Sequence, residues 1–153
     1  MSLATWELLS YVVTVVGLPL AIAVFLMEQR KERRNEEEAV YESISDNYQE
    51  FLRVVLEHPD LHLFSMTRTP ALTDEQQERM MVIFSMLISL FERAYMLLYD
   101  AHADPGKQRR WHSWEDYMRE WCARQDFRDA LDTLLAGEDP DFCAYIQALA
   151  SEP

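Results

Sequence analysis

The sequence predicts an all-α protein in which an N-terminal single transmembrane helix is followed by a cytoplasmic helical bundle. Three observations predict it: an uncharged apolar run near the N-terminus, apolar residues at helical spacing after that run, and little glycine. The 153 residues include 3 Gly and 6 Pro, too few for the many tight turns of a β-sandwich or barrel. Apolar residues make up 49% of the chain, which excludes a disordered protein.

The apolar run extends from Leu8 to Met27 without a charged residue. At ~1.5 Å per residue, a helix of this length spans roughly 30 Å, the hydrocarbon thickness of a bilayer. A cleaved signal peptide is the rival interpretation, and Ala21-Ile22-Ala23 resembles a cleavage site. However, Glu7 is the only charge before the run, whereas a signal peptide begins with basic residues. We therefore expect residues 1–28 to form an uncleaved membrane anchor.

Basic residues follow the apolar run but do not precede it. We expect them, together with Trp6 on the other side, to lie at the membrane interfaces: Arg30, Lys31, Arg33 and Arg34. By the positive-inside rule, the short N-terminus is then outside and the rest of the chain is cytoplasmic. Residues 29–40 are predicted to form a charged juxtamembrane helix whose partner is membrane lipid.

Small and weakly polar residues repeat along the apolar run at spacings of three and four: Ser10, Thr14, Gly17 and Ala21. This spacing collects them on one helical face, where membrane helices can approach closely. We interpret the face as a contact between copies of the chain, which predicts a homo-oligomer. The alternative is that such residues are simply common in membrane helices.

Residues 41–153 are predicted to form the bundle. Helical spacing predicts a first helix over 36–57, which stops before Pro59, and a core helix over 73–101, which begins with a capping box of Thr73 and Gln76. The segment from Met80 to Phe91 is apolar enough to suggest a second membrane span. At twelve residues, however, it is more typical of a buried soluble helix.

Further turns and caps divide the rest of the bundle. Asp104-Pro105-Gly106 is interpreted as a turn, and Ser113 with Asp116 as the start of a helix. That helix carries an apolar stripe, expected to face the core: Trp111, Trp114, Met118 and Trp121. A short helix closed by Gly137 follows, and Asp139-Pro140 is expected to begin the last helix.

Charge limits the partners of the bundle. The whole chain has a net charge of -13, and the segment from Glu36 onward contains 24 acidic and 10 basic residues. Such a body repels nucleic acid, which is therefore not expected as a partner. We expect Glu92-Arg93 and Arg109-Arg110 to make ion pairs around the core.

The residues of a familiar active site are missing. The sequence has no G-x-S-x-G, no glycine-rich phosphate loop, no C-x-x-C and no H-E-x-x-H, so we expect no enzyme activity, cofactor or metal. His58 and His62 are four apart, but Pro59 separates them and no third ligand completes a metal set. Cys122 and Cys143 are predicted to be buried free thiols.

One short motif offers an enzymatic alternative. Arg53 and His58 have the R-x4-H spacing that resembles the motif of HEPN-type helical ribonucleases. The resemblance implies that Arg53 would stabilise charge on a phosphodiester and that His58 would shuttle a proton. The motif has only two fixed positions, so a surface arginine followed by a helix-ending histidine is the other interpretation.

The overall layout also resembles a known group. One N-terminal span followed by a HEPN-like bundle is similar to the small membrane accessory proteins of type VI-B CRISPR systems, which form ring-shaped pores in antiviral defence. Two blocks, SLFERAYMLLYD and RRWHSWEDYMREW, resemble segments of uncharacterised bacterial single-span proteins. The resemblance implies a self-associating protein of the bacterial inner membrane, acting in defence or stress response. A membrane tether for a cytoplasmic protein partner is the further alternative.

Overall fold

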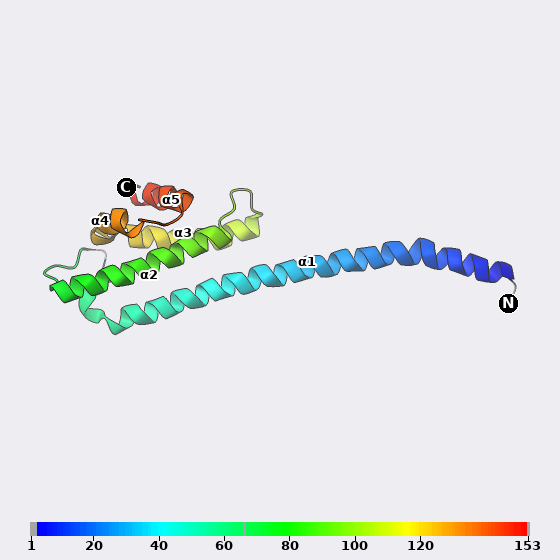
Figure 1. Ribbon diagram of the computed structural model, residues 1–153, viewed down its shortest axis with the longest axis horizontal. Coiled ribbons are helices and arrows are strands. Elements are labelled where there is room, and N and C mark those ends of the chain that lie inside the picture. Colours follow the sequence, from blue (N-terminus) through cyan, green and yellow to red (C-terminus); the bar gives the residue numbers. More distant parts are fainter. Residues whose placement is uncertain (1–2, 66, 153) are drawn as a thin grey trace. The chain divides into compact units, whose positions relative to one another are not determined.

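The computed structural model describes residues 3–65 and 67–152, with side chains from residue 15 onward in these ranges. All regular secondary structure in them is helical, which confirms the predicted all-α class (Figure 1). The chain divides into two compact units, Met1–Val40 and Tyr41–Pro153.

Helix α1 extends without a break over Leu3–Glu57, and Pro19 lies inside it. Between Val15 and Met27 its large apolar side chains are exposed, from 46% for Val24 to 69% for Val15. The four predicted interface cations between Arg30 and Arg34 are exposed as well. An apolar helical segment with no covering protein therefore precedes a basic one.

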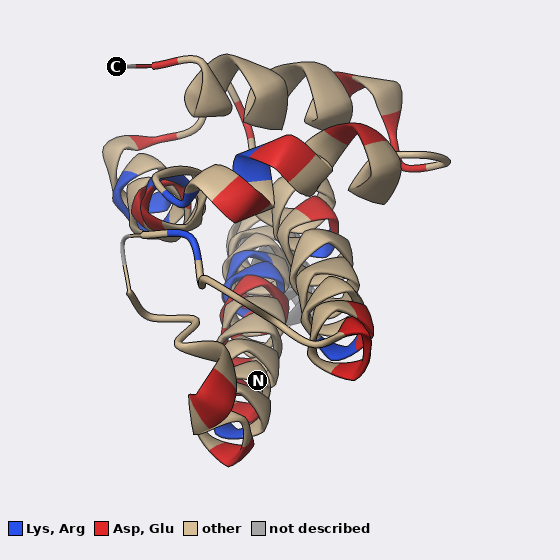
Figure 2. Cartoon of the chain, turned by 90° about the vertical axis from the view of Figure 1, so that its left-hand side faces the viewer, with Lys and Arg blue, Asp and Glu red and all other residues tan. Residues whose placement is uncertain are grey.

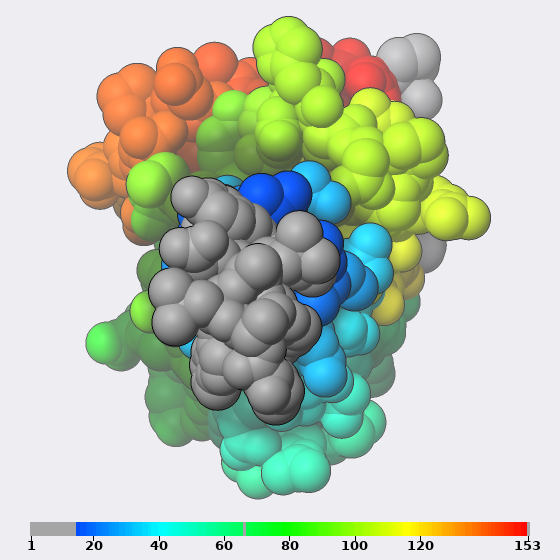
Figure 3. Space-filling model, turned by 90° about the vertical axis from the view of Figure 1, so that its right-hand side faces the viewer, coloured from blue at the N-terminus to red at the C-terminus, as the bar shows by residue number. Residues whose placement is uncertain are grey.

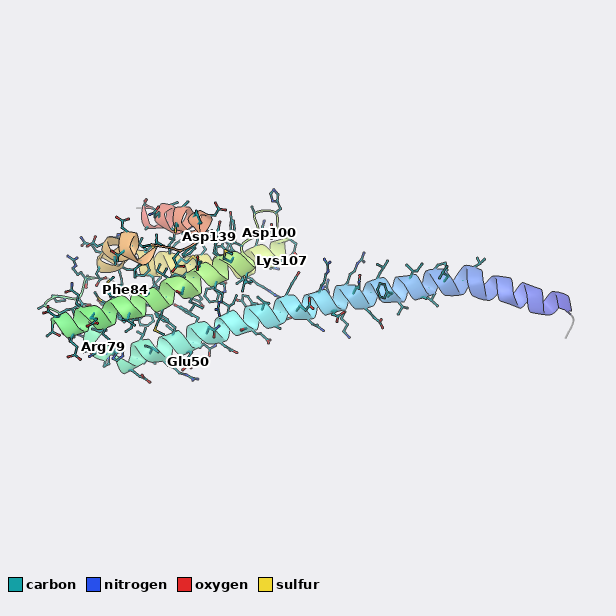
Figure 4. All side chains as sticks on the ribbon, in the orientation of Figure 1. Glu50, Arg79, Phe84, Asp100, Lys107 and Asp139 are labelled. Atoms are coloured by element: carbon teal, nitrogen blue, oxygen red, sulfur yellow. The ribbon has the colours of Figure 1, made fainter. Side chains whose placement is uncertain are left out.

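Helix α2, Asp74–Leu98, is the core helix of the second unit. The predicted capping box is confirmed: Gln76 N donates to Thr73 Oγ1 at 3.2 Å, and Thr73 N donates to Gln76 Oε1 at 3.0 Å. Phe84 and Leu87 are fully buried on one side of the helix. Phe84 is labelled in Figure 4.

By length and composition, α2 is the one helix of the described residues that could cross a membrane. A buried core helix passes the same test, and 39% of the most apolar stretch of α2 is buried. The segment predicted to span the membrane, Leu8 to Met27, lies partly outside the residues with described side chains.

Helix α3 covers Pro105–Cys122, so the predicted start at Ser113 is wrong. The helix begins at Pro105 because Asp104 Oδ1 accepts from Gly106 N at 2.8 Å and Lys107 N at 3.2 Å. Asp104-Pro105-Gly106 is thus a helix cap and first turn. Ser113 lies mid-helix, where its hydroxyl donates to the Arg109 carbonyl at 3.4 Å. In Figure 3 the α2–α3 connection stands out from the surface.

Two short helices complete the bundle: α4 over Gln125–Leu134 and α5 over Pro140–Ala150. Gly137 has a φ of +100°, the left-handed conformation expected where a glycine closes a helix. Asp139 caps α5 as predicted, because its Oδ1 accepts from Asp141 N and Phe142 N.

The last part of α1 belongs to the bundle and lies along α2, on the side of α2 away from α4 and α5 (Figure 1). It buries Ile44, Tyr48, Phe51 and Val55. Two members of the predicted tryptophan stripe of α3 contact this segment: the Trp114 ring packs against the Tyr48 ring, and Trp121 Nε1 donates to Tyr48 Oη at 3.3 Å. Burial of the stripe is confirmed, with exposures of 6% or less.

Candidate functional site

The polar groups of the bundle lie either in closed networks or along open grooves. The largest closed network lies at the α3–α4 junction. Arg124 is 2% exposed and forms a two-pronged ion pair with Asp126, whose oxygens lie 3.0 Å from Nε and 2.6 Å from Nη2. A buried charge is stable only when it is paired and hydrogen-bonded in this way.

The same arginine holds the connection between η1, the 3-10 helix Pro59–Leu61, and α2. Its Nη1 donates to the carbonyls of His62, Leu63 and Ser65 at 2.7–2.9 Å. Thr69 completes the network, since its hydroxyl donates to the Leu61 carbonyl at 2.6 Å. Every donor of Arg124 therefore serves structure, and none is left for a ligand.

Neither Arg124 nor Asp126 appears among the sequence-predicted residues. They lie two apart in the break between two helices, so no helical periodicity marks them. The carbonyl partners of Arg124 lie about 60 residues earlier in the chain. The available signal was a charged pair directly before the apolar Phe127.

A second closed network joins α3 to α5 through Tyr145. Its hydroxyl accepts from Trp111 Nε1 at 3.2 Å and donates to Glu115 Oε1 at 2.5 Å. Burial favours a raised pKa for the Glu115 carboxyl, but hydrogen bonds from Tyr145, His112 and Arg119 outweigh burial and lower this pKa below 4.5. Burial and the bond to Glu115 raise the pKa of Tyr145, so its hydroxyl stays protonated.

The thiols are not a reactive site. Both cysteines are free as predicted, but only Cys122 is buried, whereas Cys143 is half-buried. Burial raises the pKa of Cys122 to about 12, which keeps the thiol protonated. Among the described residues, no group of His, Cys, Asp and Glu could hold a metal ion.

The open groove with the most apolar lining has a volume of about 590 Å³ and lies between the Tyr41–Glu57 part of α1 and α2. Phe51 and Leu90 form its buried floor, and Val54, Val82 and Met86 form its apolar walls. Its polar lining comes from both helices: Asn47, Glu50, Ser85, Ser89 and Arg93.

The contacts of Glu92 and Arg93, near the groove, differ from the ion pairs that the sequence predicts. Glu92 points its Oε1 at Asp139 N, 2.6 Å away, and binds the start of α5. Arg93 makes no ion pair with any residue that the structure describes, so its predicted pairing is wrong. Helical phase is the reason, because consecutive residues point about 100° apart and only Glu92 faces α5. Arg110 lies over the Tyr41 ring, 5.3 Å from its centre.

The structure does not join Arg53 and His58 by any contact in the described part of the chain. Arg53 pairs with Glu50 at 2.9 Å on the surface of α1. His58 caps η1, and its carbonyl accepts from Leu61 N at 3.1 Å. His62 follows η1 with a positive φ of 45° and presents its carbonyl to Arg124.

The predicted self-contact face lies in the first unit. Gly17 and Ala21 are exposed and one helical turn apart on α1. The side chains of Trp6, Ser10 and Thr14 lie outside the described residues.

Acidic residues outnumber basic ones in the bundle, and Figure 2 marks their positions along the ribbon, seen from the end that carries η1. No protein-family model matches the chain, and neither does any curated protein or solved structure. The features of the chain that bear on function are the exposed apolar part of α1, its basic neighbours and the groove between α1 and α2.

Proposed function

We propose that this protein is a single-span protein of the bacterial inner membrane that acts by associating with further copies of itself. The observation that carries the proposal is the exposed apolar part of α1. Nine large apolar residues between Val15 and Met27 are 46–69% exposed on a continuous helix. Burying such a surface in lipid gains about 25 cal/mol per Å², whereas leaving it in water invites aggregation.

The basic residues that follow the apolar segment support an orientation with the bundle on the cytoplasmic side, by the positive-inside rule. Arg30 and Arg34 are exposed and one turn apart, directly after the apolar segment. In the proposed membrane they contact the headgroups of the inner leaflet, and the acidic bundle lies in the cytoplasm. The short N-terminus is outside.

Membrane insertion is tested by extraction and labelling of the full chain in bacterial cells. We expect it to stay in the membrane fraction at alkaline pH and to leave only with detergent. A cysteine introduced at Ser113 should react with a permeant maleimide and not with an impermeant one. A protein that high salt alone removes would overturn the proposal.

Self-association is tested in detergent by light scattering. We expect a defined oligomer, and we expect Gly17→Ile to weaken it because a large side chain keeps two helices apart. Leu18→Ile, a neighbouring change that leaves side-chain volume unchanged, is the control. A chain that stays monomeric at all concentrations would contradict the proposed function.

The oligomer is proposed to act as a pore or effector in defence or stress response. A ring of spans, each in contact with its neighbours through the small-residue face, can surround a central path. Reconstituted protein should then release a small dye from liposomes, and Gly17→Ile should reduce the release. Retained dye with an intact oligomer would leave a self-associating protein that forms no pore.

A further inference from the structure

The two sides of α2 are covered very differently. Towards α3, α4 and α5 it buries Phe84, Leu87 and Ile88 completely. Towards the groove, Val82 remains 56% exposed and Met86 44% exposed. Helix α2 is strongly apolar, and its exposed apolar side chains line an open groove. Contact of these side chains with another protein surface is more favourable than contact with water.

The groove carries one charge of each sign, on opposite helices. Glu50 lies on α1, where Figure 4 labels it, and Arg93 lies on α2. Arg93 is exposed and has no ion pair among the described residues. Glu50 has only the surface pair with Arg53, in which the side chains are 67% and 72% exposed. Such a pair is weak and exchanges easily.

We propose that this groove is the surface through which the bundle binds a second copy of the chain. The inference rests on the proposed function and names the contact that the bundle adds to the membrane span. In a two-fold contact both copies use the same patch, so residue i meets residue j while j meets i. A patch that carries both Glu50 and Arg93 can satisfy this rule, because each copy offers the acid that the other's base needs.

The shape of α2 is compatible with such a contact. Ser85 and Ser89 lie one turn apart between the larger Val82 and Arg93, and all of them line the groove. Small side chains at a crossing let two helices pack closely, while Val82 and Met86 supply apolar area. Two copies held in one membrane meet at a high effective concentration, so a modest interface is sufficient.

The test is charge reversal in the full-length protein in detergent, followed by analytical ultracentrifugation. Glu50→Arg places like charges opposite Arg93 of the other copy, and Arg93→Glu places two acids together. We expect each variant alone to associate about tenfold more weakly. The double variant restores both pairs in reverse and should associate like the unchanged chain.

Mixing the two single variants gives the most specific outcome. One copy then carries two bases and the other two acids, so a heterodimer has both pairs intact although neither variant pairs with itself. A cysteine at Ser89 in both variants should cross-link across this mixed contact. Asp116→Arg and Arg109→Glu on α3 are matched controls, since both residues are exposed and neither lines the groove.

Several results would overturn the proposal. Single variants that associate normally would show that these charges do not meet across the contact. Loss without recovery, in the mixture and in the double variant, would mean that Glu50 and Arg93 do not pair with each other across a contact between copies. Association that Gly17→Ile abolishes and charge reversal leaves unchanged would restrict the contact to the span and leave the proposed function intact. A monomeric unchanged chain would instead contradict the proposed function itself.

Discussion

Two arginines of the bundle, Arg124 and Arg93, show what distinguishes a structural site from an open one. Arg124 is 2% exposed and uses all its donors on Asp126, Thr69 and three carbonyl groups. Arg93 is exposed beside apolar side chains and has no ion pair within the described chain. The first arginine is fully satisfied by its own chain, whereas the second is available to another molecule.

The same contrast applies to the two sides of the bundle. At the α3–α4 junction, the chain supplies every partner that a buried charge requires. In the α1–α2 groove, apolar walls and charges remain in contact with water. Substitutions at the closed junction should therefore reduce stability, whereas substitutions in the groove should reduce association and leave stability unchanged.

The largest effect is expected for Arg124→Ala. It leaves Asp126 as a buried charge without its partner and frees three carbonyl groups, so the free energy of unfolding should fall by about 3–5 kcal/mol. Urea unfolding of the full chain in detergent, followed by circular dichroism, measures this loss. The exposed neighbour Arg128→Ala is the control and should cost less. A loss below about 1 kcal/mol for Arg124→Ala would contradict a structural role.

Tyr145→Phe should have the next largest effect, because it removes the hydroxyl between Trp111 and Glu115. A hydrogen bond to a charged group contributes about 1.5–3 kcal/mol, and a loss of that size is expected at pH 7. The lowered pKa of Glu115 adds a pH dependence, because the ionised carboxylate stabilises the fold. This stabilisation is present above pH 4.5 and is lost as pH falls through the folded-state pKa of Glu115.

The difference in stability between the unchanged chain and Tyr145→Phe should therefore shrink on acidification from pH 7 towards pH 3. Unfolding measured at several pH values tests this. Tyr117→Phe, on an exposed tyrosine of α3, is the matched control. A difference that stays constant over this range would mean that Tyr145 does not act through Glu115.

Some of these features could be predicted from the sequence and others could not. The all-α class, the Thr73 cap and the tryptophan stripe follow from local spacing and capping rules, which need only nearby residues. The predicted start of α3 is wrong because Ser113 with Asp116 and Asp104 with Pro105 both fit a helix start, and the Asp104 cap begins a helix that continues through Ser113. Arg124 and the groove could not be predicted, since both depend on segments that are distant in the sequence.

Met86→Gln addresses the open side. The residue is 44% exposed, so this change of similar volume should alter the free energy of unfolding by less than about 0.5 kcal/mol. Self-association should nevertheless weaken, because the substitution adds a polar group to an apolar wall of the contact. Sedimentation and urea unfolding of one preparation measure both quantities. Equal losses in stability and association would contradict the expectation that substitutions in the groove affect association alone.

The smallest effect is expected for Arg53→Ala. The side chain is 72% exposed and pairs only with Glu50, so stability should change by about 0.5 kcal/mol or less. Association should stay unchanged or strengthen, because Glu50 becomes free to meet Arg93 of another copy.

The same variant, once purified, also tests whether Arg53 takes part in catalysis. An RNA-cleaving activity of the unchanged chain that disappears in both Arg53→Ala and His58→Ala would assign these residues to a ribonuclease, and the exposed pair would then be more than a surface contact.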